Sequence, residues 1–359
     1  MPALGAGGRE FESLIRDQFY MTKKFLVVGA GLAGAVYART LAEHGHNVDL
    51  IDQRCHIGGN CYDEVDKHGI RIHKYGAHIF HTSNTRVVDW LSKYTTWRPY
   101  QHRVLAKVAH DEYHVLPINK KTAEKYSLEA ILDTFYRPYT FKMWGKKLEE
   151  LNPKIQQRVP IRDDDNELYF PNDQYQMLPE HGYTEMFSRI LDHDNIRVTL
   201  GTKFDKSFEA NYDHIFNSMS IDEYYDYDLG QLPYRSIKFV NHVLPEKRIY
   251  QTSVVNFTTW TGPTRVIEWK NFPGHGESDL TVLTYEYPCA AEDNDNERYY
   301  PIQDLAGNNR ALYDRYLNIQ NNKVTFIGRC GTYQYLDMHQ VVSSSLSAVN
   351  KFLNVDSKL

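Results

Sequence analysis

Two histidines, His78 and His81, flank a short apolar pair in the stretch KYGAHIFHT, which covers residues 74–82. An imidazole can act as a general base, ligate a metal or contact a bound cofactor. On a strand the two side chains would face opposite sides, and on a helix they would share one face. Two histidines without a third ligand make a poor metal site. No metal is therefore predicted here, and base catalysis and contact with a cofactor both stay open.

A glycine-rich turn supplies a nucleotide-binding signature near the start of the chain. Gly29, Gly31 and Gly34 follow an apolar strand predicted over residues 25–28 and lead into a helix predicted over residues 35–43. The first glycine allows a tight turn, the second lets the backbone approach a diphosphate, and the third lets the helix pack on the strand. Amides at the helix start favour the anion. We predict a dinucleotide site; the alternative is a turn that binds nothing.

The residues that follow favour FAD over NAD. Asp52 ends the second predicted strand, where a carboxylate can accept the ribose hydroxyls. The run QRCHIGGN then leads to Gly59 and Asn60, and an acid, an arginine and a Gly-Gly pair in this order resemble the FAD-binding amine-oxidase and glutathione-reductase superfamily. A second dinucleotide strand is expected there near the C-terminus. It matches VTFIGR, whose Arg329 would face the diphosphate or, alternatively, lie at the surface.

Three kinds of element must position these residues. A helix is predicted to begin after Ser127 and to be interrupted at Pro138, within a largely helical region. Further on, TSVVNFTTW and SDLTVLTYEY alternate in the manner of an antiparallel sheet. A last strand, residues 324–327, precedes a C-terminal helix. The helix predicted after Ser127 has an apolar face of four residues: Leu128, Ile131, Leu132 and Phe135.

The predicted fold class is α/β: a Rossmann-like FAD-binding domain with an inserted helical domain and an antiparallel β-sheet domain. Because the last strand and helix are expected to return to the first domain, the domains are predicted to be discontinuous. Residues 1–20 form an N-terminal extension before a second methionine. The predicted segments are 21–95, 191–225 and 320–359 for the FAD-binding domain, 118–165 for the helical substrate domain, and 96–117, 166–190 and 226–319 for the sheet domain.

Composition narrows the possible partners. The 359 residues, 42% hydrophobic and 24% charged, are typical of a soluble globular protein of two or three domains. A formal net charge of −5 argues against nucleic acid, whose binding surfaces are basic. No apolar run approaches about 18 residues, so no membrane partner is predicted. The four cysteines are scattered without zinc-type spacing and favour a cytoplasmic location.

Further features of the sequence concern metal binding, hydrolysis and the abundance of tyrosine. The acids of residues 163–165 are adjacent and point in different directions, which favours a solvated loop over a metal cluster. The sequence has neither a G-x-S-x-G elbow nor an H-E-x-x-H motif. Its 27 tyrosines either pack the core or bind a polar ligand with flat groups.

Several stretches in a fixed order resemble one family. They are DQRCHIGGN, IHKYGAHIFHT, FYRPYTFKMWG, RVPIR with a later YF, TRVIEWK, YYPI and GRCGTYQYLDM. Together they resemble the bacterial UDP-galactopyranose mutases over nearly the whole chain from Met21. The resemblance implies an isomerase that interconverts UDP-galactopyranose and UDP-galactofuranose and whose FAD must be reduced. It further implies a covalent adduct between the sugar anomeric carbon and flavin nitrogen-5, with no net redox change, an electron donor such as NAD(P)H, and a homodimer.

The resemblance also implies catalytic residues. Arg158 and Arg265 match the family's two essential arginines, which would hold the phosphate oxygens of departing UDP. Arg162 is a less secure candidate, and a surface salt bridge is the alternative for any one arginine. His78 matches the histidine nearest nitrogen-5, where it would bind or orient the flavin; proton transfer by it stays open. His81 is either part of the same loop or a structural histidine.

Binding residues follow from the same resemblance. Phe135 and Tyr139 match the pair that stacks on uracil, and Trp144 lines the pocket below; alternatively, Phe135 completes the apolar helix face. The other substrate-binding candidates are Thr140, Tyr169, Phe170, Tyr300, Tyr335 and Asp337. The cofactor-binding candidates are Gly29, Gly31, Gly34, Asp52, Gly59, Asn60, His78, Arg329, Asp337 and Met338.

The chain departs from the family at one turn, and two other functions compete with the isomerase. Asn217 and Ser218 stand where the family usually has Thr-Gly or Ser-Gly, which puts the local FAD contacts in question but not the fold. An FAD-dependent amine oxidase or desaturase would share the glycine motifs, but the matched arginines favour an anionic ligand. A non-catalytic nucleotide-binding module is the second competitor.

Overall fold

A five-stranded parallel sheet forms one half of the molecule. The computed structural model describes residues 22–108, 112–151, 160–319 and 321–356. Phe25 and Val27 of the central strand pack into the main core, and Leu26 packs on the opposite face, so the strand is buried on both sides. In spatial order the strands are β10 (Ile196–Leu200), β2 (Asn47–Asp52), β1 (Lys24–Val28), β11 (His214–Asn217) and β17 (Val324–Phe326).

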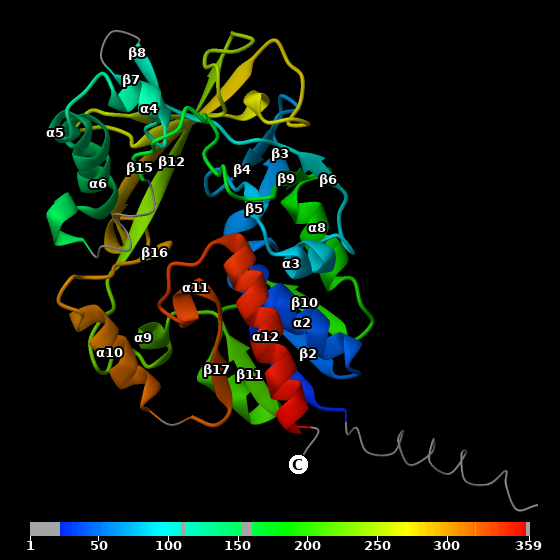
Figure 1. Ribbon diagram of the computed structural model, residues 1–359. Helices are drawn as coiled ribbons and strands as arrows, with labels where there is room; N and C mark the ends of the chain where they lie inside the picture. The colour runs from blue at the N-terminus through cyan, green and yellow to red at the C-terminus, as the bar shows by residue number, and fades with distance from the viewer. Residues whose placement is uncertain (1–21, 109–111, 152–159, 320, 357–359) are drawn as a thin grey trace, which may run out of the picture.

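Segments from both ends of the described chain meet on this sheet. Helices α2 (Leu32–Glu43) and α12 (Met338–Asp356) pack against each other, and Figure 1 shows the red α12 beside the blue α2. Together with the parallel strand order, this confirms the predicted Rossmann-like α/β class. Helix α2 begins at Leu32 and not at residue 35, because Gly31 is extended and already acts as its N-cap. Gly34 therefore lies in the first turn of the helix.

A seven-stranded sheet forms the other half and carries most of the later sequence (Figure 1). The prediction of an antiparallel sheet holds for all pairs but one, since β13 pairs with β7 in parallel. A parallel pair needs a long connection, and here the chain passes through the helical segment and the other sheets before it returns. In spatial order the strands are β16 (Tyr300–Pro301), β12 (Tyr234–Leu244), β15 (Thr281–Ala290), β14 (Arg265–Glu268), β13 (Val254–Phe257), β7 (Val104–Val108) and β8 (Glu112–Leu116).

The helical segment runs through Pro138 without a break, contrary to the predicted interruption. A π-helical turn, η3 (Leu132–Tyr136), leads directly into α6 (Arg137–Trp144), so the proline lies in the first turn of α6, where its missing N–H does no harm. Ile131 and Phe135 are buried as predicted, but Leu128 is 63% exposed. It is the first residue after the N-cap Ser127, at the solvent end of the helix. Two short helices precede the π-helical turn in the chain: α4 (Lys120–Ala123) and α5 (Leu128–Ile131).

Two small sheets and several helices complete the described chain. The three-stranded sheet combines segments that the sequence assigns to different domains, and the domain division itself stays a prediction. The small sheets consist of β3 (Asp63–Val65) with β4 (Arg71–His73), and of β5 (Phe80–Thr82), β9 (Tyr175–Pro179) and β6 (Trp97–Pro99). The remaining α-helices are α3 (Thr85–Leu91), α8 (Tyr183–Leu191), α9 (Ile221–Tyr224), α10 (Asn308–Leu317) and α11 (Gly328–Gly331).

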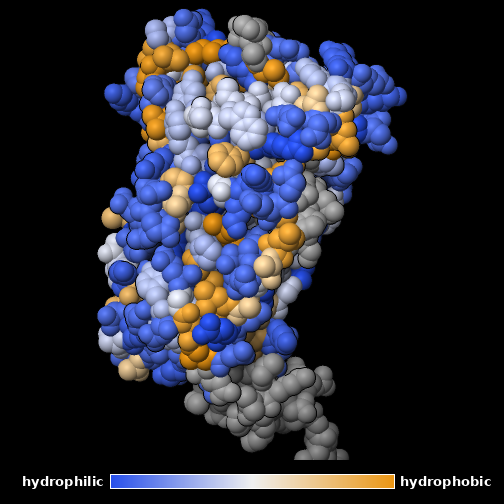
Figure 2. Space-filling view, turned by 90° about the vertical axis from the view of Figure 1, so that its left-hand side faces the viewer, coloured by the Kyte–Doolittle hydropathy of each residue, from blue (hydrophilic) through white to orange (hydrophobic). Residues whose placement is uncertain are grey.

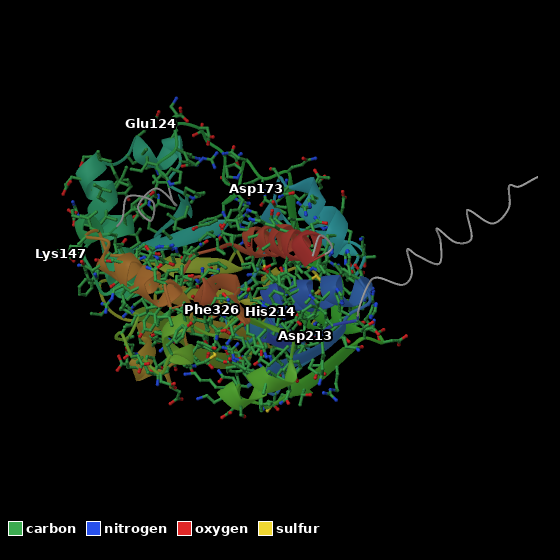
Figure 3. The ribbon with its side chains drawn as sticks, turned by 90° about the horizontal axis from the view of Figure 1, so that it is seen from below. Glu124, Lys147, Asp173, Asp213, His214 and Phe326 are labelled. Carbon is green, nitrogen blue, oxygen red and sulfur yellow. The ribbon has the colours of Figure 1, made fainter. Side chains whose placement is uncertain are left out.

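One face of the surface is shown in Figure 2. The face in Figure 2 is mostly hydrophilic, with hydrophobic side chains in separate patches. Seen from below in Figure 3, Glu124 and Lys147 mark the side of the helical segment, and Asp213 and His214 mark the end of the five-stranded sheet. Across the described ranges, no helix combines the length and apolar character that a bilayer crossing requires.

Replacing Gly34 with alanine tests the close packing of helix on strand. A Cβ at this position would lie 1.9 Å from the carbonyl oxygen of Gly29, so the backbone itself would have to move. We expect Gly34→Ala to lower the free energy of unfolding by about 3 kcal/mol, measured by chemical denaturation. The matched control is Gly45→Ala, whose Cβ would meet nothing within 4 Å although φ is +82°; it should cost about 1 kcal/mol. Equal losses would contradict the packing role.

Candidate active site

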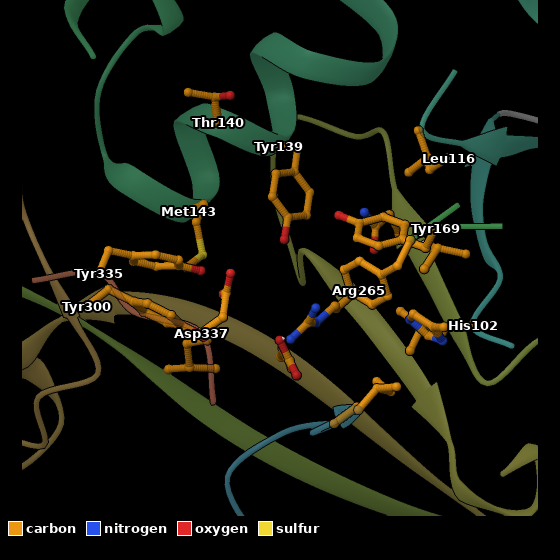
Figure 4. A pocket seen from close by; sticks show the side chains of 18 of the residues that line it. His102, Leu116, Tyr139, Thr140, Met143, Tyr169, Arg265, Tyr300, Tyr335 and Asp337 are labelled. Atoms are coloured by element: carbon orange, nitrogen blue, oxygen red, sulfur yellow. Dashed lines mark hydrogen bonds and ion pairs between the residues drawn. The ribbon is translucent and has the colours of Figure 1, made fainter. Parts of the chain in front are cut away.

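A cavity of about 330 Å³ lies where α6, the large sheet and the loop before β5 meet. Its lining combines aromatic rings with buried charges and hydroxyl groups (Figure 4). Most residues that the sequence assigned to substrate lie here, which brings together segments far apart in the chain. The predicted residues that line it are His78, Phe135, Tyr139, Thr140, Trp144, Tyr169, Phe170, Arg265, Tyr300, Arg329, Tyr335, Asp337 and Met338.

Arg265 supplies the positive charge at the centre of the cavity. It stands opposite Glu286 in the register of β14 and β15, and its Nε donates to Glu286 Oε2 at 2.6 Å. Burial opposes the charge on the guanidinium, but the Glu286 carboxylate outweighs it and raises the pKa of Arg265. Figure 4 shows Tyr139 pointing down from α6 toward this guanidinium. The arrangement can bind an anion against an aromatic wall.

A second wall is a stack of two tyrosines with a cation above them. The rings of Tyr300 and Tyr335 stack with centroids 5.3 Å apart, and Arg329 lies 5.4 Å and 5.1 Å from their centroids. The Arg329 guanidinium also donates to the backbone carbonyls of Leu336 and Tyr299. Arg329 is the second residue of the short helix α11 and does not lie at the end of a strand. Its predicted contact with a diphosphate stays a prediction.

The loop that bears His78 is fixed from several sides. The His78 N–H donates to Nδ1 of His73 at 3.1 Å, and Tyr183 donates its hydroxyl to the His78 carbonyl at 3.2 Å. The ring Nδ1 lies 2.8 Å from the Gly76 carbonyl, so it carries the hydrogen and leaves Nε2 as the acceptor. Burial lowers the pKa of His78 to about 4. The imidazole is therefore neutral at pH 7, with Nε2 as a hydrogen-bond acceptor.

Gly76 is required by the close approach of this loop to the large sheet. Its φ is +87°, and a Cβ would lie 2.7 Å from Oε1 of Glu286. A side chain would thus push against the partner of Arg265. The glycine allows the His78 loop and the buried ion pair to occupy adjacent positions in one wall.

His81 also lines the cavity, where it supports an aromatic ring. Its imidazole stacks on Phe170 with centroids 3.5 Å apart and planes inclined by 7°, and its Nδ1 lies 2.6 Å from Oδ2 of Asp173. His102 faces the same phenyl ring at 5.9 Å. The two histidines of KYGAHIFHT therefore lie at one cavity but have different neighbours. Among the described residues, no three His, Cys, Asp or Glu side chains come close enough to hold a metal ion.

The other predicted arginines do not contribute to the described lining. Arg158 lies outside the described residues. Arg162 bonds to Asp164 through Nε at 2.9 Å and does not line the cavity. The neighbouring acids interact with the helical segment, since the Asp164 carbonyl accepts from the Lys120 N–H and Asp165 accepts from that of Lys121.

The glycine motif forms a separate cradle at the start of α2. A Cβ on Gly59 would lie 2.9 Å from Cα of Gly31, so two glycine backbones border one narrow space. Helix α2 has no side-chain cap and no acidic residue in its first turn, which leaves its first amides for an anion. Asp52 accepts from the Ala30 N–H at 2.7 Å, and Asn60 accepts from Arg54 at 2.9 Å. These residues fit a dinucleotide.

The unusual serine after β11 adapts to this cradle. Ser218 donates its hydroxyl to the carbonyl of Val28 at 2.7 Å, and a Cβ on Gly29 would lie 1.9 Å from the Ser218 Oγ. The side chain is thus turned onto the central strand. Gly29 must remain a glycine because the serine occupies the space beside it.

Three cavity residues that sequence reasoning missed carry buried polar atoms without a hydrogen-bond partner in the described structure. They are Glu286 Oε1, Tyr136 OH and Asn256 Oδ1. Buried polar groups are normally paired, so these atoms mark positions that a ligand can satisfy. Their sequence signal is weak. Glu286 is the one acid within the alternating strand TVLTYEY, and Asn256 lies in the stretch TSVVNFTTW without a further signal. Tyr136 lies within FYRPYTFKMWG, between the predicted residues Phe135 and Tyr139, and that position was the available signal.

Buried histidines should make the fold sensitive to acid. Burial holds the pKa of His73 well below 6.5 and lowers that of His102 to about 3 and that of His275 to about 4. The unfolded chain binds these protons below its ordinary pKa and the folded chain does not. The free energy of unfolding should therefore fall from pH 7 to pH 5, by up to roughly 1.4 kcal/mol per pH unit for each histidine. Denaturation at several pH values measures the slope.

Substitution of one histidine identifies its share of this slope. His275 Nδ1 bonds to the Arg71 carbonyl at 2.8 Å, and an asparagine amide can donate to the same oxygen. His275→Asn should make the pH dependence shallower by one proton, whereas His242→Asn, at an exposed position, should leave it unchanged. An unchanged slope in His275→Asn would disprove the assignment.

Loss of the Glu286 charge should expose the electrostatics of Arg265. In Glu286→Gln the amide can still accept from Nε, but the guanidinium, whose side chain is 26% exposed, loses its counter-charge. Because water reaches part of this group, we expect a loss of about 1–3 kcal/mol in unfolding free energy. Millimolar pyrophosphate should then stabilise this variant more than the wild-type protein, because it supplies the missing charge. Equal stabilisation in thermal denaturation would show that Arg265 does not face the anion site.

Comparisons with known proteins agree with this geometry. Residues 134–335 match the family model described as UDP-galactopyranose mutase, and residues 27–94 match that of an NAD(P)-binding Rossmann-like domain. A probable UDP-galactopyranose mutase of Klebsiella pneumoniae is 34% identical over 92% of this chain and 95% of its own. A dTDP-fucopyranose mutase of Escherichia coli is 32% identical over 92% of this chain and 98% of its own. The crystal structure of a reduced UDP-galactopyranose mutase shares the fold, with a TM-score of 0.72 at 16% identity over 93% and 96% of the two chains.

The family match spans more than half of the chain and includes the segments that line the cavity, from the helical region to Tyr335. The Rossmann-like match over residues 27–94 covers the glycine cradle, and the two relatives match over 92% of the chain. The chain therefore belongs to the UDP-galactopyranose mutase family and is a flavin-dependent isomerase.

Proposed function

We propose that this chain interconverts UDP-galactopyranose and UDP-galactofuranose. The observation that carries the proposal is the partly buried Arg265, which faces Tyr139 across an aromatic cavity. A nucleotide sugar combines a flat base with an anionic diphosphate, so it needs both features in one site. The charged guanidinium favours this ligand over the apolar substrate of an amine oxidase or desaturase. It equally argues against a module that binds only the dinucleotide.

The proposed cofactor is reduced FAD, held by the glycine cradle. Its diphosphate would bind at the start of α2, and Gly59 and Asn60 would border it. When bound and reduced, FAD would supply a nucleophilic nitrogen-5 that forms a covalent adduct with the anomeric carbon, so that the reaction has no net redox change. Asp337 and Met338, which begin the α12 region, are proposed to contact both cofactor and substrate.

The protein's own residues would bind and orient the nucleotide sugar. Phe135 and Tyr139 are proposed to hold the uracil ring, with Trp144 below. Burial raises the pKa values of Tyr139 and Tyr300, so both hydroxyls stay protonated and can donate to phosphate oxygens. Arg265 would stabilise the negative charge that develops on UDP as it leaves. Arg158 is proposed as the second such arginine from its sequence match alone.

His78 is proposed to act near the reacting atoms. Its neutral ring keeps Nδ1 bonded to Gly76, so Nε2 is the atom that can accept a proton or a hydrogen bond. This fixes the orientation of the ring without a charge beside Arg265. A role in orienting the cofactor needs only this acceptor, and proton transfer would use the same atom.

A second substrate is favoured by one relative. The dTDP-fucopyranose mutase of Escherichia coli is nearly as similar as the Klebsiella enzyme, with 32% against 34% identity. The same reaction on dTDP-fucopyranose would require room for a thymine methyl group and no contact to a sugar 6-hydroxyl. The two substrates can be compared directly in one assay.

The proposed partners and location follow from the family resemblance and the cysteines. A donor such as NAD(P)H would reduce the flavin, and two copies of the chain would form a homodimer, as the family resemblance implies. The four cysteines are free in the described structure, which suits a reducing compartment such as the cytoplasm.

The decisive assay incubates the protein and FAD with UDP-galactofuranose, with and without dithionite, and separates the products by chromatography. Conversion to UDP-galactopyranose only under reduction supports the proposal, and trapping with cyanoborohydride should yield sugar attached to the flavin. Parallel reactions with dTDP-fucofuranose identify the better substrate. Turnover of an amine, or no reaction with either nucleotide sugar, would reject it.

Substitution of Arg265 tests its role in charge stabilisation. Arg265→Lys keeps the charge but loses the planar fork, and Arg265→Met removes both. We expect turnover to fall by about 10²–10³-fold in Arg265→Met, with a smaller loss in Arg265→Lys. Arg162→Met is the matched control, because Arg162 bonds to Asp164 outside the cavity. Steady-state kinetics with UDP-galactofuranose measures both effects, and equal losses at the two positions would contradict the assignment.

A further inference from the structure

A buried lysine connects the two walls of the cavity. Lys142 lies in α6 between the helix positions that face the cavity, and it is 9% exposed. Its Nζ does not point to solvent but donates to the carbonyl oxygens of Phe257 at 2.9 Å and Pro263 at 2.8 Å. These two residues flank the turn between β13 and β14. One ammonium group thus joins the helix to both ends of that turn.

The strands on either side of this turn carry cavity residues. Asn256 precedes Phe257 on β13, and Arg265 follows Pro263 by two positions at the start of β14. On the helix side, Tyr139 and Met143 line the same cavity. The lysine contact therefore links the helix that carries Tyr139 to the turn that precedes Arg265.

Further contacts hold α6 in place at its end and on its exposed side. Arg235 of β12 donates from Nε to the Met143 carbonyl at 2.8 Å and from Nη2 to the Lys142 carbonyl at 3.1 Å, which caps the end of α6. On the exposed side of α6, the ring of Phe141 lies beside that of Trp260, with centroids 6.1 Å apart. The helix is thus held from its end, from its buried side and from its exposed side.

Burying the ammonium group of Lys142 costs desolvation free energy. None of the described carboxylates lies within ion-pair distance of its Nζ, and burial alone lowers the pKa of Lys142 to about 8. A methionine of similar length would fill the same space without that cost. The two carbonyl contacts provide direction that an apolar side chain cannot, since each hydrogen bond fixes the position of one end of the turn.

We propose that Lys142 is a positioning residue that fixes the separation of Tyr139 and Arg265, and through it the affinity for a nucleoside diphosphate. The inference rests on the proposed function for its ligand, but its test measures binding and not turnover. It assigns to Lys142 an action through other residues, because Nζ bonds to backbone carbonyls and is not part of the cavity lining.

The test is a double-mutant cycle on UDP affinity, measured by calorimetry on the FAD-loaded protein. Lys142→Met should weaken UDP binding about tenfold in the wild-type background but less than about twofold in the Arg265→Met background, because the two positions are coupled. Lys142→Arg, which can donate to both carbonyls, should restore most of the affinity. Lys147→Met, an exposed lysine just beyond the same helix, is the matched control and should leave affinity unchanged.

Hydrogen exchange gives a second, independent measurement. Lys142→Met should speed exchange across residues 257–264, and UDP should restore less protection there than in the wild-type protein. If Lys142→Met does not fold, Trp260→Ala loosens the same helix, α6, on its exposed side and should show the same non-additivity with Arg265→Met. Equal affinity losses in both backgrounds would overturn the proposal.

The outcomes separate this inference from the proposed function. If the double-mutant cycle shows the coupling but the wild-type protein does not interconvert the sugars, the positioning role of Lys142 stands and the isomerase proposal is rejected. An active enzyme whose UDP affinity is the same with Lys142→Met rejects the role of Lys142 alone. Failure of the wild-type protein to bind UDP rejects both.

Discussion

The burial of positive charge in an aromatic cavity is the constraint on which the site depends. Arg265 is stabilised there by one carboxylate, Glu286. Two neighbouring cations, Lys142 and Arg329, are instead held by backbone carbonyls, and within the described ranges neither has a carboxylate at ion-pair distance. The dipoles of carbonyl groups stabilise a cation without cancelling its charge. The guanidinium groups of Arg265 and Arg329 therefore both offer positive charge to the cavity, which suits a diphosphate.

Neutral side chains complete this balance. Of the histidines that line the cavity, His78 and His102 have pKa values lowered by burial, which keeps both uncharged. Had they been protonated, they would repel Arg265 at short range and compete with it for the ligand. The tyrosines contribute donors without charge. The site thus concentrates its electrostatics in a few guanidinium and ammonium groups and uses rings for shape.

Sequence predicted what is encoded locally. The glycine turn, the central strand and about half of the cavity residues were found because short motifs carry them, and the fold class followed from their order. Glu286 was missed because its role depends on the register of β14 and β15, which no local pattern reveals. The continuous helix through Pro138 was missed because a π-turn places the proline in a tolerant position. Likewise, the single parallel pair depends on tertiary arrangement.

That parallel pair has a consequence for how the protein is made. The hairpin of β7 and β8 joins the large sheet only through β13, which begins at Val254, far along the chain from Val108. During synthesis the hairpin is complete long before its neighbour leaves the ribosome. Its open edge must meanwhile stay unpaired. A nascent or truncated chain that ends before Phe257 consequently exposes a strand edge to other chains, and this makes late truncations a source of aggregation.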